Sequence, residues 1–191
     1  MRLGLFGGRF DPVHLGHLLA AQGAKEALNL DQVWFIPAKT PPHKPAVAPP
    51  EARLEMLTLA VRNNPAFRAS GLELERPGPS YTVDTVLTVM RERPGDTLFF
   101  LTGVDAAALL PTWHRAEELV RLVHTAALAR PGYTLDNLGP PFRERVQTLH
   151  TRLCDLSSTE IRTRLSRRES VRYLVPEAVE RYLDRTALYR E

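Results

Sequence analysis

Short runs of apolar residues recur along this chain of 191 residues, and segments with helical periodicity lie between them. The runs at 3–6, 33–36 and 98–101 show no polar alternation, which is typical of parallel strands buried on both faces. Further strands are expected at 67–74 and 125–128, and helices at 16–28, 51–62 and 82–93. This alternation predicts an α/β fold: a doubly wound, Rossmann-like parallel sheet with helices on both faces.

No repeat, low-complexity tract or linker divides the chain, so we expect a single domain over 1–191. A parallel-sheet core would occupy 1–157 and a small helical C-terminal segment 158–191. The formal net charge of +3 is too small to identify a nucleic-acid-binding protein. No apolar run approaches the roughly 20 residues that span a bilayer, so we expect a cytoplasmic protein without a membrane partner. The single cysteine, Cys154, excludes a disulfide framework and a cysteine-based zinc site.

The segment 7–18 follows the first predicted strand, where parallel sheets bind their ligands. Gly7 and Gly8 allow close approach of a ligand to the backbone. His14 and His17 are three residues apart, so they share one face at the start of the next helix, beside its unpaired N–H groups. A glycine-rich turn with two capping histidines is the simpler alternative. A zinc site would need a third ligand, which the sequence does not place. The combination favours a phosphate site.

A second polar segment, 156–162, opens the C-terminal helical part. Ser157 or Ser158 can cap the following helix, and Arg162 can contact a phosphate. Taken alone, an ordinary capping box from Ser157 to Glu160 is the simpler interpretation. The two segments together resemble the HxGH motif and the Ser/Thr–Arg signature of the nucleotidyltransferase superfamily, which shares its fold with class I aminoacyl-tRNA synthetases. The chain has no Lys-Met-Ser-Lys-Ser segment, which argues against a synthetase.

The middle of the chain carries three further segments. Residues 39–44 follow the second predicted strand and contain two of the three lysines. Residues 78–85 open a helix whose N–H groups are available to an anion, and a proline turn with Thr82 as the helix cap is the simpler alternative. Trp113 precedes another helix, where it either packs in the core or stacks on a flat ring.

With these segments, the chain resembles bacterial nicotinate-nucleotide adenylyltransferases over about residues 1–168. The resemblance implies adenylyl transfer from ATP to nicotinate mononucleotide, giving nicotinate adenine dinucleotide and pyrophosphate in NAD biosynthesis. It implies His14, His17 and Arg162 as catalytic residues. The implied ATP-binding residues are Gly7, Gly8, Arg9, Phe10, His14, His17, Gly103, Asp105, Ser157, Ser158, Thr159, Ile161 and Arg162. The implied residues for the nicotinate nucleotide are Lys39, His43, Lys44, Ser80, Tyr81, Thr82, Asp105 and Trp113. Arg9 departs from the family, which usually has a small hydroxyl residue there.

The attacking phosphate has a second pKa near ~6, so the reaction needs no general base. Mg²⁺ is the expected cofactor, held through substrate phosphates and water rather than by a protein metal site. The phosphopantetheine branch shares both signatures and is the nearest enzyme alternative. A nucleic-acid-binding module is the alternative from another class, supported by the arginines of 162–172. The sequence leaves homo-oligomerisation open.

Overall fold

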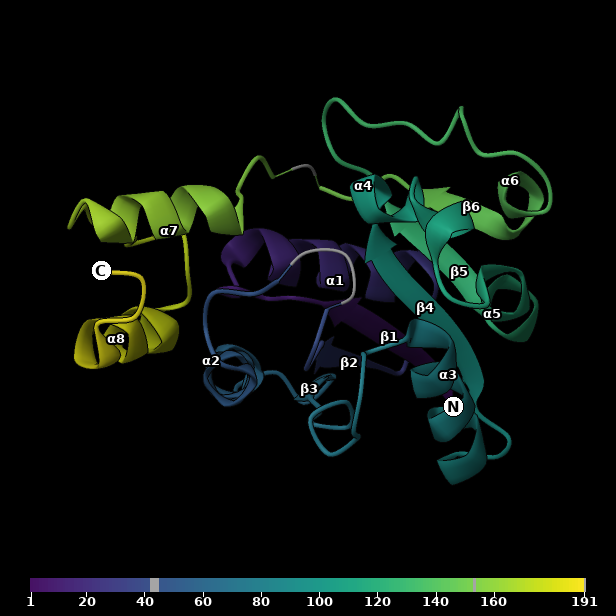
Figure 1. Cartoon of the computed structure of the whole chain (residues 1–191), viewed down its shortest axis with the longest axis horizontal. Coiled ribbons are helices and arrows are strands. Elements are labelled where there is room, and N and C mark those ends of the chain that lie inside the picture. The colour runs from purple at the N-terminus through teal and green to yellow at the C-terminus, as the bar shows by residue number, and fades with distance from the viewer. Residues whose placement is uncertain (42–44, 153, 191) are drawn as a thin grey trace.

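The computed structural model describes residues 1–41, 45–152 and 154–190. Its centre is a six-stranded sheet in which every neighbouring pair is parallel, in the order β3-β2-β1-β4-β5-β6 (Figure 1). The strands are β1 (Arg2–Gly8), β2 (Gln32–Pro37), β3 (Phe67–Ala69), β4 (Thr97–Gly103), β5 (His124–Leu128) and β6 (Val146–Leu149). The chain moves outward from β1 on one side and from β4 on the other, so the strand order reverses between β1 and β4.

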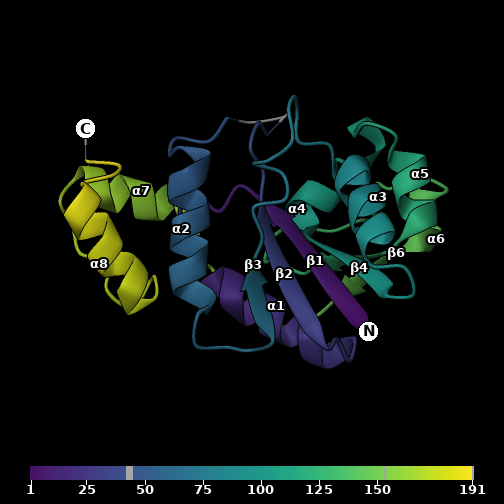
Figure 2. The ribbon, with the colours of Figure 1, turned by 90° about the horizontal axis from the view of Figure 1, so that it is seen from below.

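Helices cover both faces of this sheet, which confirms the predicted doubly wound α/β class. The helices are α1 (Leu15–Ala27), α2 (Pro50–Val61), α3 (Thr82–Glu92), α4 (Val104–Ala107), α5 (Ala116–Leu122), α6 (Phe142–Arg145), α7 (Ser158–Ser166) and α8 (Glu177–Thr186), with a 3₁₀ turn η1 (Leu110–Thr112). Figure 2 shows α2, α7 and α8 on one side of the strands and α3, α5 and α6 on the other.

Two hydrophobic clusters fill the spaces between the sheet and the helices. Phe6, Phe35 and Leu101 face the cluster that includes residues of α1, α2, α7 and α8. Leu5 and Phe100, one position away along their strands, face the cluster that includes residues of α3, α4, α5 and α6. Successive side chains of a strand point to opposite faces, so an uninterrupted apolar run supplies both cores.

Two strands differ from the expectation. Strand β3 ends at Ala69 instead of continuing to residue 74, because the chain turns after it and Leu74 donates its N–H to Gly71 O at 2.8 Å. Strand β6 was not predicted: its four residues pair with β5, with Leu149 beside Leu128. Only Val146 and Leu149 of this edge strand are buried, so the apolar run is too short to recognise.

The helical C-terminal segment packs on the same core as the sheet. Ile161 and Leu165 of α7 and Val179 and Leu183 of α8 belong to the cluster that contains Phe6. This packing brings the start of α7 to the carboxyl end of β1. In the part of the chain that the structure describes, no helix is both long and apolar enough to cross a bilayer.

Candidate functional site

Two pockets open side by side at the carboxyl ends of β1 and β4, where the strand order reverses. Both are lined by Gly7, Gly8, Arg9, Thr102 and Ala106. The first, the histidine pocket, also includes Phe10, Asp11, His14, Gly16, His17, Gly103, Asp105, Arg130, Cys154, Ser157, Ser158 and Thr159. The second, the tryptophan pocket, also includes Ala38, Pro41, Glu73, Ser80, Tyr81, Thr82, Phe100, Trp113 and His114. A ligand in one pocket therefore borders a ligand in the other.

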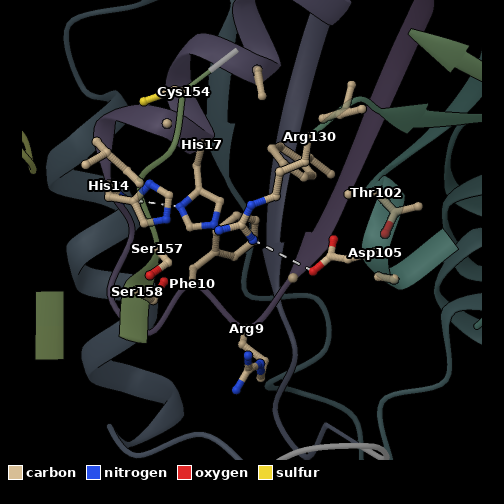
Figure 3. Close-up of a pocket in the computed structure, with 18 of the residues that line it drawn as sticks. Arg9, Phe10, His14, His17, Thr102, Asp105, Arg130, Cys154, Ser157 and Ser158 are labelled. Carbon is tan, nitrogen blue, oxygen red and sulfur yellow. Dashed lines mark hydrogen bonds and ion pairs between the residues drawn. The ribbon is translucent and has the colours of Figure 1, made fainter. Parts of the chain in front are cut away.

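His14 and His17 form a stacked pair in the histidine pocket (Figure 3). Their ring centroids are 3.7 Å apart and their planes differ by 28°. His14 is the N-cap residue of α1, and its backbone N–H donates to Nδ1 of His17 at 3.2 Å. Because Nδ1 of His17 accepts, the proton of the neutral ring lies on Nε2. The predicted juxtaposition of the two rings is thus present.

Both rings are neutral near pH 7. Burial, with a smaller contribution from the positive charge of Arg130, lowers the pKa of His14 to about 4. Burial also holds the pKa of His17 well below its ordinary value, and His14 and Arg130 add to this effect. A neutral imidazole can donate one N–H, and a phosphate at this position would favour the protonated form.

Phe10 supports the histidine pair through ring packing. Its ring packs edge-on against His17 with centroids 5.0 Å apart, and the side chain is almost fully buried. The residue has a positive φ of 49°, which turns the chain sharply after Gly8. Arg9 precedes it and points away from the histidines (Figure 3). Phe10 therefore acts on the pocket mainly by placing His17.

The start of α7 lines the histidine pocket on the side of His14 (Figure 3). Ser157 is its N-cap and accepts the N–H of Glu160 at 3.1 Å, as a capping residue does. The hydroxyl of Ser158 donates to Pro12 O at 2.9 Å. This bond joins two motifs that are 146 residues apart in sequence. Two helix N-termini, of α1 and α7, thus face one pocket, which suits an anion.

Two other residues of α7 lie away from the pocket. Arg162 donates to Asp11 O at 2.7 Å, and its guanidinium lies behind the loop that lines the pocket. Ile161 is fully buried in the hydrophobic core, and its N–H donates to Ser157 O within the helix. This geometry favours a structural contribution of Ile161 over the predicted contact with ATP.

A cationic residue that the sequence analysis did not identify closes the histidine pocket. Arg130 follows β5, extends toward His17, and lies 3.9 Å from the Asp105 carboxylate (Figure 3). The rule that ligands bind beyond the carboxyl ends of strands could have found it, because the strand at 125–128 was predicted. Asp105 follows β4. It lines the histidine pocket but not the tryptophan pocket.

Aromatic rings line the tryptophan pocket. Trp113 meets Phe100 edge-on, with centroids 6.0 Å apart, and Tyr81 stacks on His114 at 4.2 Å. The start of α3 lies in the same pocket. The N–H of Tyr81 donates to Pro79 O, and Thr82 is the first residue of α3, where N–H groups have no partner within the helix. The pocket therefore combines flat apolar surface with donors suited to a carboxylate.

One acidic residue lies in this pocket as well. Glu73 is buried and accepts the Thr85 hydroxyl at 2.6 Å. Burial raises the pKa of Glu73, although hydrogen bonds from Thr85 and Ser80 oppose that shift.

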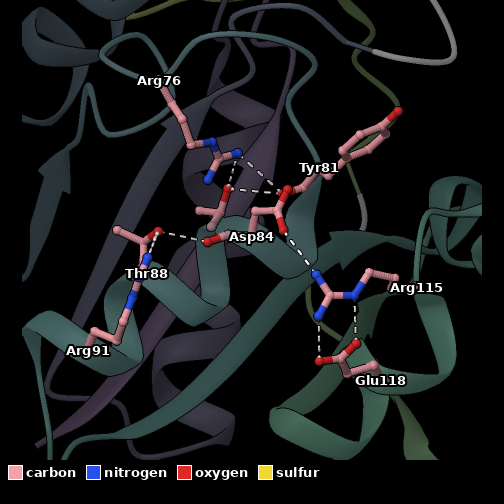
Figure 4. Close-up of polar contacts among 8 residues, drawn as sticks. Arg76, Tyr81, Asp84, Thr88, Arg91, Arg115 and Glu118 are labelled. Carbon is pink, nitrogen blue, oxygen red and sulfur yellow. Dashed lines mark hydrogen bonds and ion pairs between the residues drawn. The ribbon is translucent and has the colours of Figure 1, made fainter.

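Ion pairs brace the outer wall of the tryptophan pocket (Figure 4). Arg115 binds Glu118 through two bonds of 2.7 and 2.8 Å and reaches Asp84 of α3 at 3.4 Å. On the other side of α3, Arg76 donates to Tyr81 O and to the Thr85 hydroxyl. These contacts fix the loop that carries Trp113 against the start of α3.

The predicted residues for the second ligand divide into four groups, and Asp105 forms one of them because it lines the histidine pocket and not the tryptophan pocket. Ser80, Tyr81, Thr82 and Trp113 line the tryptophan pocket. Lys39 does not line it: its Nζ donates to Arg76 O at 3.2 Å and so joins two loops. His43 and Lys44 lie outside the described residues.

A metal that entered the histidine pocket with a phosphate ligand would meet a carboxylate at the edge of the pocket. Asp105 lies at the edge of the histidine pocket, and its carboxylate pairs with Arg130. Among residues 1–41, 45–152 and 154–190, no group of three His, Cys, Asp or Glu side chains is placed to hold a metal ion.

The sequence of this chain is similar to those of known proteins along its whole length. The family described as "Cytidylyltransferase-like" matches residues 5–164. A protein of Thermus thermophilus named "Probable nicotinate-nucleotide adenylyltransferase" is 54% identical over 190 residues, covering 100% of both chains. One with the same name from Exiguobacterium sibiricum is 46% identical and covers 99% of both.

Solved structures show the same fold. The Plasmodium falciparum nicotinic acid mononucleotide adenylyltransferase complexed with NaAD superposes with a TM-score of 0.77 at 18% identity, covering 98% of this chain and 97% of that one. A structure of the same parasite enzyme complexed with APC also gives 0.77, at 16% identity, covering 98% and 96%.

Proposed function

Because the chain belongs to the nicotinate-nucleotide adenylyltransferases of the cytidylyltransferase-like family, we propose that its two adjoining pockets bind the two substrates of that reaction. The enzyme transfers the adenylyl group of ATP to nicotinate mononucleotide and releases pyrophosphate. The observation that carries the assignment of the pockets is their shared border at Gly7, Gly8 and Thr102. The α-phosphorus of ATP and the attacking phosphate meet at this border.

The histidine pocket binds ATP in this proposal. Nε2 of His17, the N–H groups at the starts of α1 and α7, and Arg130 surround the triphosphate, and His14 completes the donor set. Ser158 holds the start of α7 against the loop after β1 through its bond to Pro12 O. Arg162 acts through that loop, because its guanidinium binds Asp11 O instead of lining the pocket.

The tryptophan pocket binds nicotinate mononucleotide. The pyridine ring stacks on Trp113, and the carboxylate meets the N–H of Thr82 and its neighbours at the start of α3. Lys39 acts through its bond to Arg76 O. His43 and Lys44 belong to the proposed set from their place in the sequence. Asp105 lies across the border, toward the ATP side.

Catalysis rests on alignment and charge stabilisation. The phosphate of the mononucleotide is already ionised at neutral pH, so it attacks the α-phosphorus in line without a general base. The P–O bond to pyrophosphate breaks as the new P–O bond forms, and negative charge moves onto the leaving group. The N–H of His17, the helix starts and Arg130 stabilise that charge. When bound with the substrate phosphates, Mg²⁺ would supply additional positive charge to the leaving group.

Since the reaction consumes ATP, we place the enzyme in the cytoplasm. Nucleotides are its proposed partners, and association with further copies of the chain stays a prediction.

A coupled assay of pyrophosphate release tests the function. We expect turnover with ATP, Mg²⁺ and nicotinate mononucleotide, and much slower turnover with nicotinamide mononucleotide or phosphopantetheine. Equal rates with the amide would contradict the assignment of the α3 start as a carboxylate site. Turnover with phosphopantetheine alone would assign the enzyme to the sister branch.

A further inference from the structure

Arg53 is the largest fully buried side chain among the residues that the structure describes. It comes from the first turn of α2 and is 0% exposed. Burying a guanidinium is costly unless every donor is satisfied. The hydrogen bonds of the Arg53 guanidinium therefore indicate the role of this residue.

The guanidinium of Arg53 donates to backbone carbonyls of three separate segments. Nε donates to Ala48 O at 3.1 Å and one terminal nitrogen to Arg9 O at 2.8 Å. The other terminal nitrogen donates to Ala38 O at 2.7 Å and to Lys39 O at 3.4 Å. One planar group thus joins the loop after β1, the loop after β2 and the segment that enters α2.

These segments are the ones that form the substrate pockets. Arg9 lies on the border that the two pockets share, and Ala38 lines the tryptophan pocket. The segment at Ala48 is held from both sides, because Asp11 accepts the N–H groups of Val47 and Ala48 at 2.7 and 3.0 Å. Asp11 belongs to the histidine pocket, so the network reaches both ligands.

We infer that Arg53 is a positioning residue for adenylyl transfer: it fixes the ATP-binding loop relative to the loop of the mononucleotide. This inference rests on the proposed function of the two pockets. A small error in the alignment of two bound phosphates lowers the rate of in-line attack without removing the contacts that bind either substrate. Loss of Arg53 should therefore act on kcat.

The test compares Arg53→Ala, Arg53→Lys and the control Arg62→Ala, an exposed arginine just after the same helix. We expect Arg53→Ala to lower kcat by about 10²-fold, with much smaller changes in the KM of either substrate. Arg53→Lys should also lose activity, because an ammonium cannot span carbonyls of three segments. Arg62→Ala should leave both parameters unchanged.

Chemical rescue distinguishes a missing donor from a damaged fold. Guanidinium at concentrations far below those that unfold the protein should restore part of the kcat of Arg53→Ala, while urea at the same concentration should not. Arg53→Met fills the space without donors and should resist rescue. A near-normal kcat for folded Arg53→Ala, absence of rescue, or unfolding of both Arg53→Ala and Arg53→Lys would each overturn the inference in favour of a general structural role.

A second readout is independent of the substrates. Hydrogen exchange of the ligand-free Arg53→Lys protein should be faster than wild type at residues 8–11 and 38–41, and unchanged in β4 and β5. Unchanged exchange in those loops would contradict the inference even if the wild-type enzyme proved active. Inactivity of the wild type with nicotinate mononucleotide would instead contradict the proposed function.

Discussion

The backbone N–H of His14 donates to Nδ1 of His17, so the first histidine fixes the tautomer of the second. The two stacked rings then present one defined donor, Nε2 of His17, to the pocket. The bond orients the ring of His17 without a carboxylate partner. It also makes the pair sensitive to substitutions that keep the shape of the ring but move its donor.

His17→Ala should lower kcat by about 10²–10³, as loss of a donor to a developing anion does, with smaller effects on substrate affinity. His17→Gln should retain more activity than His17→Asn, because the Gln amide reaches nearer the position of Nε2. Steady-state kinetics of the three variants checks this order. A near-normal kcat for His17→Ala would refute the role of the ring.

Acid should destabilise the ligand-free protein through His14. Its pKa is about 4 in the folded state and about 6.5 when unfolded. Between these values the unfolded chain binds more protons, so the stabilising contribution is complete above pH 6.5 and disappears as pH falls toward 4. Thermal melts across this pH range should show that the melting temperature falls less with pH for His14→Asn than for the wild type. If the melting temperatures of the two proteins fell in parallel with pH, His14 would not contribute to the acid sensitivity.

Trp113 should contribute more to the binding of nicotinate mononucleotide than to the binding of ATP. Trp113→Ala should raise the KM for nicotinate mononucleotide, because the pyridine ring loses its stacking surface, while Trp113→Phe should retain part of the affinity. Kinetics with each substrate varied in turn measures the difference. The assignment of the pockets would be reversed if the KM for ATP rose instead.

Arg130 should contribute to ATP binding. A hydrogen bond to a charged group is worth about 1.5–3 kcal/mol, so Arg130→Ala should raise the KM for ATP by roughly 10- to 150-fold. Arg121→Ala is the matched control, because Arg121 forms an exposed pair with Glu117 on α5. A similar response of both variants would indicate a nonspecific effect of surface charge.

The parts of the fold and site that depend on local pattern could be predicted from the sequence. The apolar runs give β1, β2, β4 and β5, and three-residue spacing brings His14 and His17 together on one helix start. Ser157 caps α7 because its side chain can reach a nearby N–H, which is also a local property.

Contacts set by tertiary placement could not be predicted in this way. An arginine within a helix normally indicates a solvated face, and only the folded chain shows that Arg53 lies among backbone carbonyls. Lys39 has a long flexible side chain, so its position in sequence does not decide between a ligand and Arg76 O. Edge strand β6 has too little buried surface to give an apolar run.

The most direct measurement is a crystal structure with Mg²⁺ and a non-hydrolysable ATP analogue. We expect phosphate oxygens within hydrogen-bond distance of Nε2 of His17 and at the start of α7, with the α-phosphorus at the border with the tryptophan pocket. Phosphates bound elsewhere, with the two imidazoles still packed against each other and contacting no part of the nucleotide, would contradict this expectation.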